Sequence, residues 1–405
     1  MSRGPFSQRV PASLEAGPWA RRLAALRAQG RALIDLSDHN PTTADLGYLE
    51  DPGLLEALSH PVRGPYTPAA AGLESAREAI ALYYHDRGIH VAAEQIVLTS
   101  GTSEAYAHAF RLLCDPGETI LAPRPSYPLF ESLAQAEGCR IATYPLVLED
   151  GAWRIDVVAL DAVIRATPGL RAIVTVNPNH PTGSFLSQTD AAALHDICMR
   201  HNLTLIGDEV FGDFRGGYGR SPSEIRRSLL ECSDTDRVET PLRFVLSGLS
   251  KVCGLPQAKL GWIVVAGTRK LEQQAVERLE WLADAFLSVG QSVQHALPAL
   301  LAGRERFQAA VHERVERNRA ALGLLMTGIP GSALLPADGG WSAVIALPPV
   351  RTDEEWALAL LEHDVVAHPG YFYDFDEPGR LVLSLLPPPE AFDRALKALF
   401  EIARG

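Results

Sequence analysis

Short apolar runs alternate with amphipathic segments along the first two thirds of the chain, and this alternation constrains the fold most. Runs that are apolar at nearly every position are typical of strands buried on both faces, and helix-period segments such as 103–114 and 188–202 lie between them. The pattern predicts an α/β domain with a largely parallel sheet flanked by helices. The expected strands are Gln95–Ser100, Thr119–Pro123, Arg140–Leu146, Arg171–Val176, Leu203–Asp208, Arg243–Gly248 and Gly261–Gly267.

The pattern changes from about Glu272 onward. Two long amphipathic helical stretches come first, and short apolar runs and a closing helix follow. We expect a smaller α+β domain here, because 405 residues exceed what one small core organises. The predicted division is an N-terminal arm with part of the small domain (1–46), a large cofactor-binding domain (47–285) and a C-terminal small domain (286–405).

Composition narrows the partners and the compartment. A net charge of -12 argues against general affinity for nucleic acid or anionic membranes, so small molecules and other protein chains are the expected partners. No signal peptide or membrane-spanning stretch is visible in the sequence. Scattered cysteines without a CxxC pair favour a reducing compartment and offer no metal site, so we predict a cytoplasmic protein. The cysteines are Cys114, Cys139, Cys198, Cys232 and Cys253.

Ligands of a parallel α/β sheet collect beyond the carboxyl ends of its strands, so the loops after the strands are the places to search. The first is "TSGTSEAY", where Gly101 permits a sharp turn and Thr102 and Ser103 begin a helix. Free N–H groups, the helix dipole and two hydroxyls suit a phosphate. An ordinary helix N-cap explains the same residues.

Ionisable groups follow two further strands. Asp208 and Glu209 stand where an apolar strand ends, and a buried carboxylate needs a cationic or proton-donating partner, from the protein or from a cofactor ring. Lys251 follows another strand among small and apolar residues, with Lys259 eight positions later. A partly desolvated lysine loses its proton more readily and becomes a Schiff-base nucleophile.

The fourth loop is "VNPNHPTGSF", Val176 to Phe185, which holds Asn177, Asn179 and His180 between prolines. Ordinary turn chemistry accounts for such residues on its own. A rigid display of hydrogen-bonding groups toward a ligand is the alternative.

Eight motifs in register give the chain a family resemblance. They are "YTPAAAGLESAREAI", "TSGTSEA", "PRPSYPLF", "NPNHPTG", "DEVF", "SKVCGLPQAKLGW", "HPGYFYDF" and "GRLVLSLL". The chain resembles the class I/II aminotransferases, the fold-type I enzymes that depend on pyridoxal 5'-phosphate (PLP). The resemblance implies that an α-amino acid donates its amino group to a 2-oxo acid by a ping-pong mechanism. It also implies an obligate homodimer with a shared active site.

The resemblance assigns roles to the residues at the strand ends. Lys251 would be the Schiff-base lysine and the proton shuttle, and Asp208 would pair with the protonated pyridine nitrogen. Gly101, Thr102 and Ser103 would form the phosphate cradle. Ser250 and Ser247 are further candidates for phosphate contact, and Lys259 stands where the family most often has arginine. The hydroxyl usual three residues before the lysine is missing, because that position is Gly248.

Other positions would complete the pocket. Tyr127 matches the aromatic residue that stacks on the pyridine ring, and Tyr66 the tyrosine that reaches the phosphate of the neighbouring subunit. Arg380 matches the arginine that binds the substrate α-carboxylate. Asp38, His39 and Asn40 align loosely with a strip that lines the substrate pocket, although loop polarity explains them equally well.

Two positions depart from the family pattern at one cofactor atom, the phenolic oxygen O3'. The usual Asn donor is replaced by His180, with Asn179 one place earlier, and the usual Tyr donor is replaced by Phe211. We favour His180 over Asn179 as the O3' partner, because the flanking prolines fix the register. Fewer donors should leave the phenolate less stabilised and raise the pKa of the Schiff base.

Other activities on the same fold stay open. A C–S lyase, a cyclase or other carbanion chemistry would use the same residues, whereas a PLP-sensing transcription regulator would need a DNA-binding segment longer than Met1–Leu46. A dedicated aspartate enzyme needs a second cation, and 283–297 contains no arginine.

Overall fold

The computed structural model describes residues 7, 9–11, 15–59, 65–231 and 239–404. Cys232 lies outside these ranges. In the described part no helix is long and apolar enough to cross a membrane, and no group of three or more His, Cys, Asp or Glu side chains is arranged to hold a metal ion.

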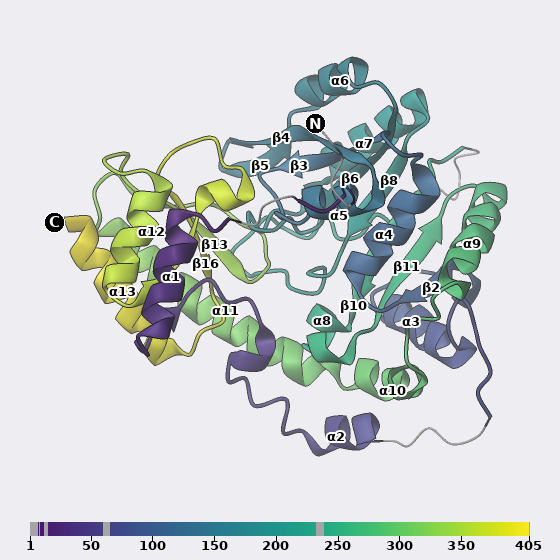
Figure 1. Ribbon diagram of the computed structural model, residues 1–405, viewed down its shortest axis with the longest axis horizontal. Coiled ribbons are helices and arrows are strands. Elements are labelled where there is room, and N and C mark those ends of the chain that lie inside the picture. The colour runs from purple at the N-terminus through teal and green to yellow at the C-terminus, as the bar shows by residue number, and fades with distance from the viewer. Residues whose placement is uncertain (1–6, 8, 12–14, 60–64, 232–238, 405) are drawn as a thin grey trace.

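An eight-stranded sheet forms the centre of the larger part of the molecule (Figure 1). The strands from β10 to β4 run parallel, whereas β11 is antiparallel to both of its neighbours and β5 pairs antiparallel with β4. All seven predicted strands are present, and β5 is additional. In spatial order they are β2 (Ile96–Thr99), β11 (Gly261–Ala266), β10 (Arg243–Gly248), β8 (Thr204–Asp208), β6 (Leu170–Val176), β3 (Thr119–Arg124), β4 (Arg140–Glu149) and β5 (Ala152–Ile155).

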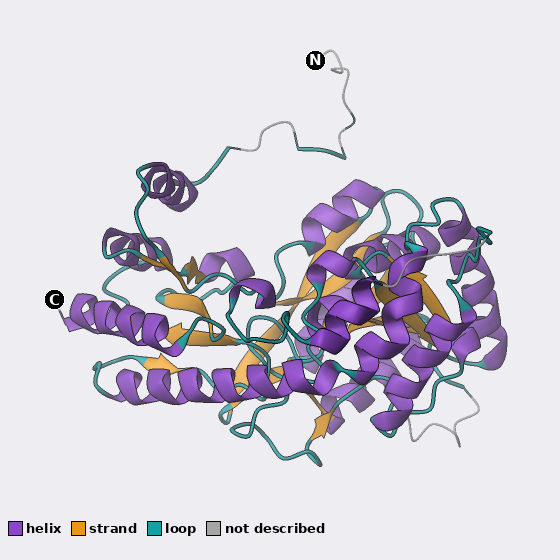
Figure 2. Cartoon of the chain, turned by 90° about the horizontal axis from the view of Figure 1, so that it is seen from below, coloured by secondary structure: helices purple, strands orange, loops and turns teal. Residues whose placement is uncertain are grey.

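Helices cover both faces of this sheet, which explains why its strands are apolar throughout (Figure 2). Successive residues alternate between two cores: Val97 packs on one face and Leu98 on the other. The first face carries α4 (Thr102–Leu113), α5 (Phe130–Glu137) and α9 (Arg269–Asp284). The second carries α3 (Glu74–Asp86), α6 (Val157–Ala166), α7 (Gln188–His201) and α10 (Gln291–Ala302).

A second, smaller unit contains the C-terminal third. Its antiparallel sheet has the order β12 (Ala333–Leu334), β13 (Ser342–Ala346), β16 (Arg380–Ser384) and β15 (His368–Pro369). Around it lie α11 (Arg304–Thr327), α12 (Asp353–Glu362) and α13 (Pro389–Arg404). Helix α11 runs along the molecule from the end of α10 to this unit (Figures 1 and 2).

The N-terminal segment joins the smaller unit. Strand β1 (Ile34–Asp35) pairs in parallel with β14 (Val365–Val366), and α1 (Pro18–Ala28) packs against α12. Helix α10, by contrast, packs against α3 and α2 (Pro52–Ser59), beside the large sheet. The first of the two expected helical stretches is thus two helices, α9 and α10. Helix α10 adjoins the large unit rather than the small one. Two short strands, β7 (Leu186–Ser187) and β9 (Ile225–Arg226), form a separate antiparallel pair.

Candidate active site

The carboxyl ends of β8, β6 and β10 bring three of the predicted loops to one edge of the sheet. Asp208 ends β8 and lies in register with Val176 on β6 and Leu246 on β10. Short helix α8 (Leu249–Val252), which carries Lys251, follows β10 directly. Parallel pairing therefore places the Asp208, His180 and Lys251 loops side by side.

Lys251 lies in a largely apolar setting. Its Nζ is 4.9 Å from the ring centre of Trp341 and 5.5 Å from that of Phe211, and it donates to the backbone oxygen of His39 at 3.2 Å. Among the described residues no carboxylate forms an ion pair with it. Burial lowers the pKa of Lys251 to about 8, although Asp38 and Asp208 act in the opposite direction. The amine is therefore partly deprotonated near neutral pH, as a nucleophile or base requires.

Asp208 is a buried carboxylate that the protein satisfies only in part. Its Oδ2 accepts from the Tyr106 hydroxyl at 2.9 Å and its Oδ1 from the Val210 amide at 3.1 Å. Burial raises the pKa of Asp208 to about 6, which these hydrogen bonds and Lys251 partly offset. A cationic N–H partner would hold this carboxylate ionised.

The neighbouring Glu209 plays a different part. Its Oε1 accepts from the Leu229 amide at 2.7 Å, and its Oε2 has no hydrogen-bond partner among the described residues. Burial raises the pKa of Glu209 to about 7. Of the two carboxylates, Asp208 is the one whose pKa responds to Lys251.

The predicted phosphate cradle begins α4. Gly101 precedes the helix with a φ of 153°, and Thr102 is the first helical residue. The first-turn amides of a helix have no backbone partner within it, so they face an incoming anion. A Cβ at position 248 would lie 2.9 Å from the Cα of Gly261. A side chain that carries a hydroxyl therefore does not fit at Gly248 in this backbone. Ser250 is half-buried, one residue before Lys251, whereas Lys259 is exposed in a left-handed conformation with φ of 54°.

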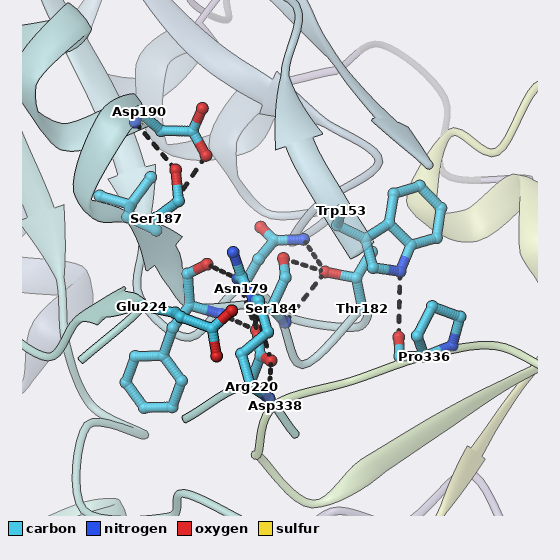
Figure 3. Close-up of polar contacts among 12 residues, drawn as sticks. Trp153, Asn179, Thr182, Ser184, Ser187, Asp190, Arg220, Glu224, Pro336 and Asp338 are labelled. Carbon is cyan, nitrogen blue, oxygen red and sulfur yellow. Dashed lines mark hydrogen bonds and ion pairs between the residues drawn. The ribbon is translucent and has the colours of Figure 1, made fainter. Parts of the chain in front are cut away.

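The turn after β6 is held by its own polar network, drawn in Figure 3. Asn179 accepts from the Ser126 hydroxyl at 3.0 Å and donates to the Pro125 carbonyl at 3.1 Å and to the Thr182 hydroxyl at 3.0 Å. Beyond it, Asp338 accepts from the Phe185 amide at 3.0 Å and forms a buried ion pair with Arg220 at 2.6 Å. The side-chain amide of Asn179 is thus committed to the turn.

His180, by contrast, points into a cage of rings. It stacks on Phe211 with 5.8 Å between ring centres and meets Tyr373 edge-on at 5.3 Å and Tyr127 at 6.3 Å. Its Nδ1 lies 3.1 Å from the Ser342 hydroxyl. Burial, together with the neighbouring charge of Lys251, holds the pKa of His180 well below its ordinary value.

The N-terminal strip contributes one side chain to this cage. His39 meets His180 edge-on at 5.0 Å, and its Nε2 lies 2.9 Å from Ser342 Oγ. Asp38 and Asn40 instead accept hydrogen bonds within their own turn, from the amides of Asn40 and Thr42. Of the three predicted pocket residues, only His39 reaches His180.

Two predicted residues form no hydrogen bond or ring contact with His180 among the described residues. Arg380 pairs with Ala346 at one end of β16, whereas Ser342 pairs with Ser384 at the other. At about 3.3 Å per residue, four residues separate these Cα positions by about 13 Å. Arg380 lies beside Asp353, which accepts its amide at 2.9 Å. Tyr66 is 65% exposed and lines a surface hollow with Leu73 and Leu287.

Sequence reasoning missed several residues of the site. Trp341, Ser342 and Tyr373 come from the smaller unit. Tyr373 lay within the motif "HPGYFYDF" but was not singled out, and no motif contained Trp341 or Ser342. Tyr106 lay within the motif "TSGTSEAY", but its partner Asp208 is 102 positions away. Helical spacing from Thr102 was the only available signal for it, since positions four apart share a helix face.

Comparison with known proteins identifies the family. The family model "Aminotransferase class I and II" matches residues 55–399. Glutamate-pyruvate aminotransferase AlaA of Escherichia coli K12 is 26% identical over 404 residues, covering 96% of this chain and 95% of that one. Human tyrosine aminotransferase is 30% identical over 276 residues, covering 67% and 58%. The chain belongs to the class I and II aminotransferases.

Solved structures show the same fold at low identity. An alanine aminotransferase from Pyrococcus furiosus superposes with a TM-score of 0.82 at 22% identity, covering 96% of this chain and 100% of that one. A Thermus thermophilus aspartate aminotransferase mutant also gives 0.82, at 21% identity, covering 99% and 100%. The protein is therefore a PLP-dependent aminotransferase of fold type I, acting on amino and 2-oxo acids.

The residues present fit this cofactor. Among the described residues no cationic N–H group hydrogen-bonds to Asp208, and Lys251, at the same edge of the sheet, is an amine whose pKa is lowered to about 8 by burial. The amino end of α4 supplies phosphate donors. When bound, PLP supplies an electron sink that stabilises the carbanion formed as the substrate Cα loses a proton.

Proposed function

We propose that Lys251 is the nucleophile and proton carrier of this aminotransferase and that Asp208 binds the cofactor ring nitrogen. The observation that carries the assignment is the setting of Lys251: a half-buried side chain whose amine lies near the rings of Trp341 and Phe211, without an ion-pair partner in the described chain, and with a pKa lowered to about 8. A base near neutral pH accepts a proton from Cα and returns it efficiently. Gly101, Thr102, Ser103, Ser250 and Lys259 would hold the phosphate, and Tyr127 would stack on the ring.

His180 would face the phenolic oxygen of the cofactor. Asn179, the alternative, has its side-chain amide engaged in three hydrogen bonds within the turn. Within the described ranges the ring nitrogens of His180 have one hydrogen-bond partner, Ser342. The turn therefore leaves His180, and not Asn179, available to a ligand.

We infer that the preferred donors are amino acids with uncharged side chains. The walls around Lys251 and His180 are aromatic, and in the described residues no arginine hydrogen-bonds to either of them. A distal carboxylate would be left without a cationic partner there. Relatives named alanine aminotransferase and tyrosine aminotransferase support this choice.

A donor panel tests both assignments. Each amino acid is mixed with the PLP-loaded enzyme without an oxo acid, and conversion to the amino form of the cofactor is read from absorption. Alanine and tyrosine should convert the cofactor faster than aspartate, and Lys251→Ala should convert none. Lys270→Ala, an exposed lysine on α9 outside the proposed site, serves as the matched control and should still convert. Faster conversion by aspartate contradicts the donor assignment, and conversion by Lys251→Ala contradicts the role of the lysine.

A homodimer with shared active sites is the proposed assembly. Besides Tyr66, several other large apolar side chains are exposed, and exposed apolar surface marks interfaces. They are Leu55, Leu58, Trp281 and Phe286. If Tyr66 serves the neighbouring site, inactive Lys251→Ala mixed and refolded with Tyr66→Phe should regain activity above the sum of the two. In such a hybrid, one site keeps both residues. Activity that merely averages the parents contradicts a shared site.

The proposed location is the cytoplasm. The four described cysteines, Cys114, Cys139, Cys198 and Cys253, are all free thiols. Free thiols persist in reducing compartments.

A further inference from the structure

Four groups from three separate segments form a hydrogen-bonded chain that ends at His180. The Ser37 carbonyl lies 3.0 Å from His39 Nδ1, and His39 Nε2 lies 2.9 Å from Ser342 Oγ. Ser342 Oγ in turn lies 3.1 Å from His180 Nδ1. The N-terminal strip, β13 and the turn after β6 each contribute to this chain.

The donors and acceptors along the chain can be assigned from its first member. A carbonyl oxygen only accepts, so His39 must carry its hydrogen on Nδ1. A neutral imidazole has one N–H, so His39 Nε2 accepts and must receive the Ser342 hydroxyl hydrogen. Burial lowers the pKa of His39 to about 3, which keeps the ring neutral.

The same counting continues to His180. The single hydrogen of Ser342 is already donated to His39, so Ser342 Oγ can only accept from His180 Nδ1. The pKa of His180 is held well below its ordinary value, so this ring is neutral as well. Its remaining nitrogen, Nε2, has no hydrogen-bond partner among the described residues.

We propose that the Ser37–His39–Ser342–His180 chain fixes His180 as the Nδ1–H tautomer, so that Nε2 presents a lone pair to the ligand site. Any ligand atom facing Nε2 must then donate a hydrogen. From the sequence we expected His180 to donate a hydrogen bond in place of the family's Asn. Under this proposal His180 accepts one instead. Ser342 and His39 act as positioning residues that set the polarity of His180.

A consequence for the cofactor rests on the function proposed above. If the phenolic oxygen of PLP faces His180, an accepting Nε2 stabilises the protonated phenol, whereas a donating N–H would stabilise the phenolate. Phe211 supplies no hydroxyl that would compensate. The chain would therefore shift the bound cofactor toward its neutral-phenol form.

The charged and titratable groups around this hydrogen-bonded chain favour the neutral forms of His39 and His180. Lys251 and His368 both lower the pKa of His39 and His180, and the one carboxylate acting on His39, Asp38, ranks after them. His368 is itself bound through Nδ1 to the Tyr373 hydroxyl at 2.9 Å. Protonation of His39 would reverse the direction of these hydrogen bonds. His39 Nε2 would then donate to Ser342 Oγ, and Ser342 would donate to His180 Nδ1.

Imidazole ¹⁵N–¹H correlation spectra test the proposal, because protonated and unprotonated ring nitrogens fall in separate shift ranges. Uniformly ¹⁵N-labelled protein is measured with and without PLP. The pattern of His180 among the twelve histidines is assigned by its loss in His180→Asn. The expected result at pH 7 is a protonated Nδ1 and an unprotonated Nε2. A protonated Nε2 in the wild-type protein would overturn the proposal.

Two substitutions should release the tautomer and two should keep it. Ser342→Ala removes the hydroxyl, and His39→Leu frees that hydroxyl to donate to His180, so both should move the hydrogen of His180 toward Nε2. Ser342→Thr keeps the hydroxyl. Ser384→Ala also removes a serine hydroxyl, but from the cross-strand partner of Ser342, which is not part of the hydrogen-bonded chain. An unchanged His180 spectrum in a folded Ser342→Ala or His39→Leu variant would contradict the proposal. If one of the two variants does not fold, the other still tests it.

Absorption of the PLP-loaded proteins gives a second readout. Ser342→Ala should raise the phenolate band relative to the neutral-phenol band by severalfold at pH 7, and Ser384→Ala should not. An unchanged band ratio in Ser342→Ala overturns the consequence for the cofactor. The spectra of cofactor-free protein separate the two proposals. If His180 is the Nδ1–H tautomer but the enzyme transfers no amino group, only the proposed function is contradicted. If the enzyme transfers amino groups but His180 is the Nε2–H tautomer, only the proposed hydrogen-bonded chain is contradicted.

Discussion

The phenolic hydroxyl of Tyr106 lies 2.9 Å from Oδ2 of Asp208 and donates to it across the edge of the sheet. The carboxylate is buried, and its pKa is raised to about 6, so Asp208 loses its charge as the pH falls through about 6. Affinity for PLP should fall over the same range, because the ring nitrogen needs an anionic partner. Tyr106 opposes this loss by stabilising the carboxylate.

Tyr106→Phe should therefore raise the pKa of Asp208 and weaken PLP binding. Hydrogen bonds to charged groups contribute about 1.5–3 kcal/mol, so the expected loss is about tenfold to a hundredfold in Kd at pH 7. Fluorescence titration with PLP between pH 5 and 8 measures it. Tyr144→Phe is the matched control, since that buried hydroxyl donates to the Val174 carbonyl at 2.9 Å. Equal losses in both variants would mean that only packing was disturbed.

The small number of lysines makes the assignment of Lys251 directly measurable. The sequence has four, at positions 251, 259, 270 and 397. Borohydride reduction of the PLP-loaded protein should attach the cofactor to Lys251 alone, because only a neutral amine adds to an aldehyde and burial lowers the pKa of Lys251 to about 8. Peptide mass spectrometry identifies the modified residue. Labelling chiefly at Lys259 would contradict the assignment.

The pH dependence of that labelling has a defined sign. The neutral fraction of Lys251 should rise as the pH passes through about 8 and then level off. An unperturbed lysine would continue to rise to about pH 10.4. Initial rates of PLP attachment between pH 6 and 10, followed by absorption, locate the midpoint. A midpoint above pH 10 would show that the amine is not desolvated as its contacts imply.

Arg380 remains a predicted ligand of the substrate α-carboxylate. The prediction is that its guanidinium binds this group. If it does, Arg380→Ala should raise KM for the amino acid about tenfold to a hundredfold with a smaller change in kcat. Arg351→Ala, whose guanidinium packs over the Trp356 ring at 4.8 Å, is the control. An unchanged KM in Arg380→Ala would exclude the role.

Local sequence patterns predicted the parts of the site that lie on the large sheet. Asp208, His180 and Lys251 each follow a buried parallel strand, and parallel strands deliver their following loops to one edge. Ser342 and Trp341 could not be placed in this way, because their position depends on how the smaller unit packs against the larger one. The polarity of His180 depends on them. Sequence thus indicated an altered cofactor contact, while its direction required the tertiary structure.

Restoring the family's hydroxyl at position 211 tests how the altered contact tunes the cofactor. Phe211 is 8% exposed, stacks on His180 and lies 5.5 Å from Lys251 Nζ, so a tyrosine hydroxyl there would enter the same cage. A donor to the phenolic oxygen stabilises the phenolate, so Phe211→Tyr should lower the apparent pKa of the visible absorption of the bound cofactor. A shift of about one unit corresponds to about 1.4 kcal/mol, within the range of one charge-assisted hydrogen bond. Phe375→Tyr, at the same 8% exposure in a separate core, should leave that pKa unchanged. An unchanged or raised pKa in Phe211→Tyr would mean that the hydroxyl does not reach the phenolic oxygen, and that Phe211 shapes the cage by packing alone.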